Sequence, residues 1–392
     1  MPQHARPHPR RRVRGTRTAV AALAGALLLG ACSTPDAPPT AAPAASPLPT
    51  AATTPGGTLL VADFGADTVT FVDPERGAVG SVPVGRAPYG LVVGADGRAW
   101  VATAEGVAVV DTRTRTRLTM IPYRTTGTGP ATGGEYRGGG MGIALSPDGA
   151  HAYAGVNVPG TTGVLEVIDT AKTQVTAVVP VGRRPFDVDV SRDGSEVYVT
   201  GHDSFDVTVV PVGSCGGTGG TGESAASEPP RRIEVAPYGT EGGLGSWLKP
   251  HYAVVRPADG MLLLPFEGER LAVVDPRTGR TTVEEMTADT HQHGAAITAD
   301  GRLLVVGTGA VEPGKGKGPS LTVRSPDGSE RVYPLDGPHE GVAVSRDGRT
   351  AYVTGGYTRD GYWNGITVVD LDTGSSRRLA AGSRPLGIAV LG

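Results

Sequence analysis

Short apolar stretches separated by Asp-Gly pairs recur along most of this chain. Six segments share one pattern, in which an apolar run is followed by Asp-Gly and then by a second apolar run. The aspartates of these pairs are Asp96, Asp148, Asp193, Asp259, Asp300 and Asp347. Because glycine readily adopts the positive φ of a tight turn, Asp-Gly between alternating apolar residues predicts a β-hairpin. A seventh copy, Pro385-Leu-Gly-Ile-Ala-Val, begins the same pattern without its turn.

The spacing of these hairpins predicts the fold. The residue six places before each turn aspartate, and its counterpart in the seventh copy, is small or is an aspartate: Gly90, Gly142, Asp187, Ala253, Gly294, Gly341 and Gly387. Several copies continue with a third apolar run that ends near Val-Asp, at Asp73, Asp111, Asp169, Asp275 and Asp370. Four short strands per 40–50 residues is typical of a β-propeller blade, and residues 57–392 accommodate seven units of about 48 residues. We therefore predict an all-β, seven-bladed β-propeller.

The two ends of the repeat region complement each other. Thr58-Leu-Leu-Val-Ala begins in mid-blade, whereas Gly387–Leu391 supplies a lone first strand. We expect this last strand to complete the first blade and close the ring, which removes free sheet edges that would recruit other chains. We also expect a monomer.

Composition and charge narrow the function classes. The chain has 60 glycines and 33 prolines in 392 residues and only 5 % aromatic residues, which excludes a helical bundle or coiled coil, and the absence of a three-residue glycine period excludes collagen. The first 31 residues contain six arginines and no acidic residue, so the net charge of the remainder falls from −3 to −9. We expect no nucleic-acid partner, because such binding needs clustered Lys and Arg.

The N-terminus has the pattern of an export signal. A basic stretch from Arg10 to Arg17 precedes an apolar run from Ala19 to Ala31, which is too short to span a bilayer. The segment Leu29-Gly30-Ala31-Cys32 resembles the bacterial lipobox, and that resemblance implies acylation of Cys32. We predict a lipoprotein signal peptide at 1–31, a lipidated cysteine and flexible Pro/Ala/Thr linker at 32–56, and the propeller at 57–392. An ordinary signal peptide with an incidental cysteine is the alternative.

This interpretation predicts an exported protein anchored by lipid to the outer face of the bacterial cytoplasmic membrane, or a periplasmic one. The choice between Sec and Tat export stays open, because only part of a twin-arginine motif is present. A transporter solute-binding protein or a cell-wall component is the partner we consider.

Histidines gather where blades begin. His251, His291, His293 and His339 lie at the entrances to the innermost strands of three consecutive predicted blades, and His202 lies in a loop between second and third strands on the same predicted face. Because the first strands surround one channel, these side chains can meet there, with Glu267 and Glu340 close by.

Imidazole suits zinc, copper, nickel and iron, and three protein ligands with one open position is a common zinc arrangement. We predict a transition-metal site, with zinc the first candidate, at the top of the central channel. His251, His293 and His339 are the first-choice ligands, His291 is an alternative or second ligand, and Glu267 or His202 completes the shell.

Two other functions remain open. The histidines can instead hydrogen-bond the blade entrances of a protein-interaction scaffold, or one of them can act as acid–base in a lyase or lactone hydrolase. No Gly-x-Ser-x-Gly nucleophile motif occurs, and we do not favour an enzyme.

Several segments resemble the YVTN-repeat seven-bladed propellers. They are Val197-Tyr-Val-Thr, Ala351-Tyr-Val-Thr, Thr367-Val-Val-Asp-Leu-Asp-Thr-Gly and Val82-Pro-Val-Gly-Arg-Ala-Pro. This resemblance covers nearly all of 57–392 and implies the fold, while propellers of this kind serve as scaffolds, ligand binders and enzymes.

The blade-entrance histidines resemble those of periplasmic zinc-chaperone propellers. The matching segments are Lys249-Pro-His251-Tyr, His291-Gln-His293-Gly and Pro338-His339-Glu-Gly. The resemblance implies zinc binding and transfer to a solute-binding protein. The streptogramin lyases are a weaker match, in which His251 and His293 take the histidine roles; His291 there replaces an acid, and imidazole is a poor ligand for the Mg²⁺ that family uses.

Overall fold

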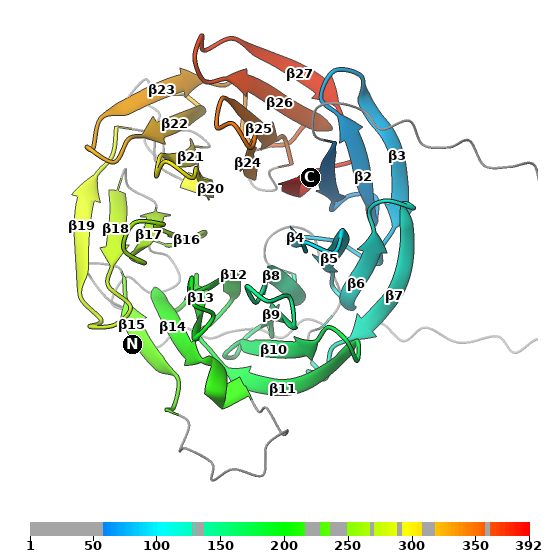
Figure 1. The fold of residues 1–392 in the computed structure, drawn as a ribbon, viewed down its shortest axis with the longest axis vertical. Helices are drawn as coiled ribbons and strands as arrows, with labels where there is room; N and C mark the ends of the chain where they lie inside the picture. The colour runs from blue at the N-terminus through cyan, green and yellow to red at the C-terminus, as the bar shows by residue number, and fades with distance from the viewer. Residues whose placement is uncertain are drawn as a thin grey trace, which may run out of the picture. The chain divides into compact units, whose positions relative to one another are not determined.

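A computed structural model describes residues 58–127, 129, 137–215, 228–235, 249–266, 270–287, 292–307, 318–356 and 361–392. These residues form seven four-stranded antiparallel sheets that follow one another around a central axis (Figure 1). The predicted seven-bladed β-propeller is confirmed. The predicted signal peptide, Cys32 and linker lie outside the described residues.

The blades are numbered from the first strand of the described chain. Blade 1 contains β28 (Pro385–Val390), β1 (Leu59–Asp63), β2 (Thr68–Asp73) and β3 (Gly77–Pro83). Blade 2 contains β4 (Leu91–Val93), β5 (Arg98–Ala102), β6 (Gly106–Asp111) and β7 (Thr116–Pro122). Blade 3 contains β8 (Gly139–Leu145), β9 (His151–Asn157), β10 (Val164–Asp169) and β11 (Gln174–Pro180). Blade 4 contains β12 (Pro185–Val190), β13 (Glu196–Gly201), β14 (Asp206–Pro211) and β15 (Arg231–Glu234), with the 3₁₀ helix η1 (Val212–Cys215) after β14.

The remaining three blades repeat this order. Blade 5 contains β16 (Val254–Val255), β17 (Leu262–Phe266), β18 (Arg270–Val274) and β19 (Thr281–Glu285). Blade 6 contains β20 (Gln292–Ile297), β21 (Leu303–Gly307), β22 (Ser320–Arg324) and β23 (Glu330–Pro334). Blade 7 contains β24 (Val342–Val344), β25 (Thr350–Thr354), β26 (Gly365–Asp370) and β27 (Ser376–Ala380).

The hydrophobic core lies between neighbouring blades. Leu60 and Phe71 of blade 1, for example, pack in one cluster with Val101 and Val110 of blade 2, and all four are fully buried. Equivalent clusters join each pair of neighbours around the ring, including blade 7 with blade 1. Burial of one such side chain contributes about 1.5–3 kcal/mol. Each blade is therefore stabilised mainly by its two neighbours.

The C-terminal strand closes the ring. β28 pairs antiparallel with β1, with Leu59 opposite Val390 and Val61 opposite Ile388. The predicted closure of the first blade by the last strand is confirmed. It leaves β1 hydrogen-bonded on both sides.

The Asp-Gly pairs form the turns that the sequence predicts. The glycines after the six turn aspartates all have positive φ, between 69° and 85°. Asp96 shows the local geometry, because its Oδ1 accepts a hydrogen bond from the Arg98 backbone N–H at 3.0 Å. These turns lie at one end of the inner strands, so the predicted histidine positions lie at the opposite end.

The small residues six places before the turns sit where the inner strands of adjacent blades touch. A Cβ atom on Gly387 would lie 2.4 Å from the Tyr89 carbonyl oxygen, and one on Gly294 would lie 2.4 Å from the Glu340 carbonyl oxygen. The backbone N–H groups of these two glycines donate hydrogen bonds to the same oxygens at 3.1 and 2.8 Å. At these glycine positions the backbone of neighbouring inner strands is so close that a larger side chain would clash. Among the described residues, no helix has the length and apolar character needed to cross a bilayer.

Candidate functional site

A cluster of aromatic side chains lies beside the central channel. Tyr89, Phe186 and Tyr252 line a cavity of about 120 Å³, together with residues of the inner strands. The ring centroids of Phe186 lie 5.6 Å from Tyr89 and 5.4 Å from Tyr252, in edge-to-face contacts. Such contacts favour a fixed arrangement of the rings. Phe186 also contacts two histidines, which places those histidines next to the channel.

Three of the predicted site histidines form a row of imidazoles. His202 follows β13 in blade 4, His251 precedes β16 in blade 5, and His293 lies in β20 of blade 6. The ring centroids of His202 and His251 are 4.5 Å apart, and those of His251 and His293 are 4.4 Å apart. All three side chains are at most 3 % exposed. Residues 91 positions apart thus meet because successive blades bring their loops to one channel.

A carboxylate contacts the first histidine of the row. His202 Nδ1 is 2.8 Å from Asp203 Oδ1. Arg184 forms a 2.7 Å ion pair with Asp203, and Lys249 Nζ lies 3.5 Å from it. Burial opposes ionisation of Asp203, but the hydrogen bond from His202 and the neighbouring positive charges lower its pKa to about 2. Asp203 is therefore an anion that orients His202.

A second carboxylate contacts the last histidine. His293 Nδ1 is 2.9 Å from Glu340 Oε2, and the Tyr252 hydroxyl donates a 3.3 Å hydrogen bond to Glu340 Oε1. Burial and the charges of Glu340 and Asp187 raise the pKa of Tyr252 well above its ordinary value, so the phenol stays neutral and can donate. The expectation that Glu340 lies close to the site histidines is confirmed for His293.

The Asp203 contact selects one ring nitrogen of His202, whereas the Glu340 contact with His293 is an ion-pair distance without hydrogen-bond geometry. When Nδ1–H points at a carboxylate, Nε2 carries the lone pair, which is the usual arrangement for a metal-binding histidine. Burial also lowers the pKa of His202, although the hydrogen bond and charge of Asp203 oppose the shift. A neutral imidazole is the form that binds metal.

His339 makes different contacts from the other predicted ligands. Its Nδ1 lies 2.6 Å from the Gly337 carbonyl oxygen, its Nε2 lies 2.7 Å from Thr367 Oγ1, and its ring packs against Trp363 with a 5.8 Å centroid separation. Burial lowers its pKa to about 4. Both ring nitrogens are thus engaged within blade 7. These contacts match the hydrogen-bonded blade-entrance alternative at this position.

The described residues contain no group of three or more His, Cys, Asp and Glu side chains placed as a ready metal cage. Ligation of one ion by His202, His251 and His293 therefore requires their rings to turn within the row. The residue types, the buried neutral imidazole of His202 and the carboxylates at both ends fit a transition metal. Glu267 and His291, the other predicted ligands, lie outside the described residues.

Sequence reasoning missed the residues that support the row. Asp203 is adjacent to His202 in the sequence, and this His-Asp pair was a usable signal. Phe186 and Tyr252 each precede a channel position, Asp187 and Ala253, which was a second signal. Asp203 contacts Arg184, which precedes the first strand of blade 4, and Lys249, which lies in the segment before blade 5. No local sequence pattern predicts these two contacts.

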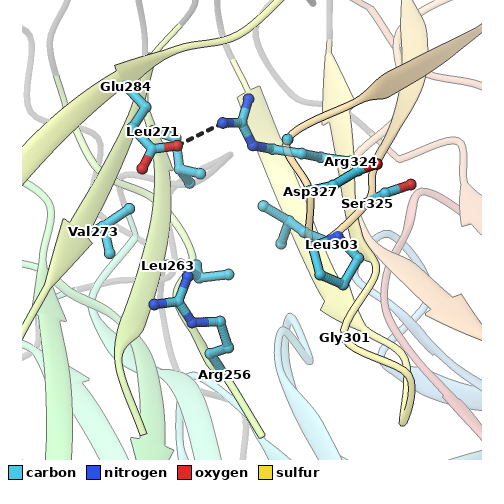
Figure 2. Close-up of a pocket in the computed structure, with 12 residues that line it drawn as sticks. Arg256, Leu263, Leu271, Val273, Glu284, Gly301, Leu303, Arg324, Ser325 and Asp327 are labelled. Carbon is cyan, nitrogen blue, oxygen red and sulfur yellow. Dashed lines mark hydrogen bonds and ion pairs between the residues drawn. The ribbon is translucent and has the colours of Figure 1, made fainter. Parts of the chain in front are cut away.

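A second hollow lies between blades 5 and 6 and is less suited to a ligand. Its volume is about 250 Å³, and its apolar wall includes Leu263, Leu271 and Leu303 (Figure 2). Arg324, which points across it, already forms ion pairs with Glu284 at 2.5 Å and with Glu330 at 2.7 Å. Its charge is therefore satisfied within the protein.

No protein-family model and no curated protein matches the sequence. Several solved structures are similar in fold. A functionally unknown protein of Desulfotomaculum acetoxidans has a TM-score of 0.64 at 9 % identity, covering 86 % of this chain and 99 % of that one. A Pseudomonas aeruginosa periplasmic gluconolactonase has a TM-score of 0.58 at 16 % identity, covering 86 % and 99 %. Kuenenia stuttgartiensis hydrazine synthase has a TM-score of 0.56 at 16 % identity, covering 83 % and 92 %. At these identities the likeness extends to the fold alone.

Proposed function

We propose that this protein is an exported, lipid-anchored propeller that binds a transition-metal ion, zinc first, through His202, His251 and His293. The observation that carries the proposal is the row of three buried imidazoles with Asp203 at one end and Glu340 at the other. Cys32 is the proposed lipid attachment site. The proposed location is the outer face of the cytoplasmic membrane or the periplasm, where a solute-binding protein or cell-wall component is accessible.

Each residue of the row has a distinct part in this function. His202 presents Nε2, because Asp203 holds the opposite nitrogen. His251, in the middle of the row, and His293, whose Nδ1 lies 2.9 Å from Glu340, are the other two donors. Arg184 and Lys249 keep Asp203 ionised and fixed. Bound zinc would supply a Lewis-acid centre with an open coordination position. His339 serves to hold the entrance of blade 7.

Zinc titration by calorimetry tests this assignment on the chain from residue 33 onward, which lacks the predicted lipid site. We expect about one equivalent to bind with sub-micromolar affinity at pH 7.5, and affinity to fall as pH drops below about 6.5 because protons compete for the imidazoles. His251→Ala and His293→Ala should each weaken binding about 100-fold or more.

The matched controls are His339→Ala and His151→Ala. His151 is half-buried in β9 and stacks on Tyr153, away from the row. Both variants should bind zinc as the parent does. The assignment is wrong if the parent binds no zinc at micromolar concentration, or if His339→Ala weakens binding as much as His293→Ala.

The His293–Glu340 contact also supports a second candidate, hydrolysis of a lactone by general-base catalysis. A base oriented by a carboxylate is a recurring arrangement, and a periplasmic gluconolactonase shares the fold. Turnover of gluconolactone that disappears in both His293→Ala and Glu340→Gln would favour this candidate. Unchanged background hydrolysis would eliminate it for that substrate.

A further inference from the structure

The innermost strand of blade 4 differs from every other innermost strand. In the other blades, the position six residues before the turn aspartate, or its counterpart in the seventh copy, is Gly or Ala, and the position two residues later on the same strand is Ala or Val. The other six pairs are Gly90 and Val92, Gly142 and Ala144, Ala253 and Val255, Gly294 and Ala296, Gly341 and Ala343, and Gly387 and Ala389. In β12 the two positions are Asp187 and Asp189. One blade thus supplies two carboxylates where the others supply none.

These carboxylates lie on one side of β12, because alternate residues of a strand share a face. Asp187 lines the 120 Å³ channel cavity, and its Oδ2 accepts a 3.0 Å hydrogen bond from the Ala253 backbone N–H. The Oδ2 atom of Asp189 is buried and accepts no hydrogen bond from any described residue. Among the residues that the structure describes, no Lys, Arg or His forms an ion pair with Asp187 or Asp189.

Such an arrangement is costly unless something neutralises it. A buried carboxylate is normally paired with a cation, bound to a metal or protonated. Burial raises the pKa of Asp187 to about 6, and burial together with the charge of Asp187 raises that of Asp189 well above its ordinary value. Either a shared proton or a bound cation can relieve the repulsion.

We propose that the central channel binds a hard cation of the Ca²⁺ type between Asp187 and Asp189. Carboxylate oxygens and water are the ligands that such ions prefer, and the adjoining cavity has room for water ligands. This oxygen site is separate in chemistry from the imidazole row, which suits zinc. It would join β12 to the neighbouring inner strands and stabilise the ring at the channel.

Calorimetry with Ca²⁺, and Tb³⁺ luminescence sensitised by channel tyrosines such as Tyr252, test the proposal on metal-depleted protein. We expect one Ca²⁺ per chain, a higher melting temperature with Ca²⁺, and a Tb³⁺ signal that Ca²⁺ displaces. Asp187→Asn and Asp189→Asn should each weaken Ca²⁺ binding at least 10-fold. Asp96→Asn, in an exposed turn, is the matched control and should bind as the parent does.

Stability without metal distinguishes the outcomes and shows whether the variants fold. In metal-depleted protein at pH 8, Asp189→Asn should melt at or above the parent temperature, because it removes the charge of a half-buried carboxylate whose buried Oδ2 atom has no hydrogen-bond partner among the described residues. Added Ca²⁺ should reverse that order. Absence of Ca²⁺ and Tb³⁺ binding, or equal binding by parent and Asp189→Asn, overturns the proposal and leaves a shared proton as the explanation. His293→Ala should keep full Ca²⁺ binding, so failure of the zinc site is separable from failure of this one.

Discussion

The buried histidines His202 and His339 have different hydrogen-bond partners, and the partner decides what each side chain can do. His202 contacts an anionic Asp203, whereas His339 contacts a backbone carbonyl and a hydroxyl. Burial lowers the pKa of both. His202 is therefore a neutral imidazole that can donate a lone pair to a metal beside other imidazoles. His339 is a neutral imidazole with a structural role. The sequence could predict that histidines reach the channel, but not which nitrogen each one presents, because rotamers depend on packing between blades.

The pKa of His339 makes a prediction about stability. Its folded value of about 4 lies below the ordinary 6.5, so the unfolded chain takes up a proton first as pH falls. The stability contributed by the neutral ring is present above pH 6.5 and is lost progressively as pH falls, by about 3 kcal/mol at pH 4. His339→Gln should lose less stability than the parent between pH 7 and 4.5, as measured by urea unfolding.

Carboxylates with a raised pKa have the opposite effect on the pH dependence of stability. Their effect cancels when the parent is compared with His339→Gln. Burial raises the pKa of Asp63 and Asp206 to about 6, so they favour the folded state as pH falls. Both are present in parent and variant. Identical pH profiles for the two proteins would contradict the role given to His339.

The contact between Glu340 and His293 leads to a second prediction, about zinc affinity. Glu340→Gln keeps the shape but removes the charge that faces His293 Nδ1. Zinc affinity should fall about 10–100-fold without being abolished, as for other groups that orient metal-binding histidines. Calorimetry measures the change, and Glu105→Gln, which alters an exposed ion pair with Arg86, is the control. Unchanged zinc affinity in Glu340→Gln would show that the Glu340 carboxylate has no role in zinc binding.

Among the elements, the inner strands decide how closely blades approach. Their glycines place backbone against backbone, and their Asp-Gly turns fix the register of each hairpin. Both signals are local, so the blades and their number could be predicted from the sequence. Blade 4 differs in having the 3₁₀ helix η1 directly after β14. The contacts of Asp203 with Arg184 and Lys249 could not be predicted, since they join segments 19 and 46 residues away.

Substitution of an inner-strand glycine tests this packing. In Gly387→Ala the new Cβ would meet the Tyr89 carbonyl oxygen at 2.4 Å, and the neighbouring backbone cannot yield easily. We expect a loss of about 1–3 kcal/mol in the free energy of unfolding. Gly213→Ala is the control, because nothing lies within 4 Å of its added Cβ. Equal effects of the two substitutions in denaturant unfolding would show that the close approach is unimportant.

The whole molecule is a ring whose last strand completes its first blade. β28 hydrogen-bonds β1, and Ile388 and Val390 pack in the cluster that joins blades 7 and 1. Because the ring is closed, loops from blades 4, 5 and 6 are held around one channel and can build a shared site. Repeat spacing predicts that histidines of neighbouring blades converge, with His251, His293 and His339 as first-choice ligands. In the structure His202 rather than His339 is the third member of the row.

Removal of residues 385–392 tests the importance of closure. The truncated chain would expose the β1 edge and lose one side of the blade 7–blade 1 core. We expect a broad, less cooperative melting transition and aggregation in size-exclusion chromatography. Deletion of Gly392 alone is the control. A truncated protein that melts and elutes like the parent would show that the ring does not depend on β28.

The most direct test of the metal assignment is anomalous X-ray diffraction at the zinc edge from crystals grown with zinc. We expect one peak about 2.0–2.1 Å from a ring nitrogen of each of His202, His251 and His293, with Nε2 as the ligand atom of His202. A peak on His339, or no peak beside an unchanged row of imidazoles, would contradict it.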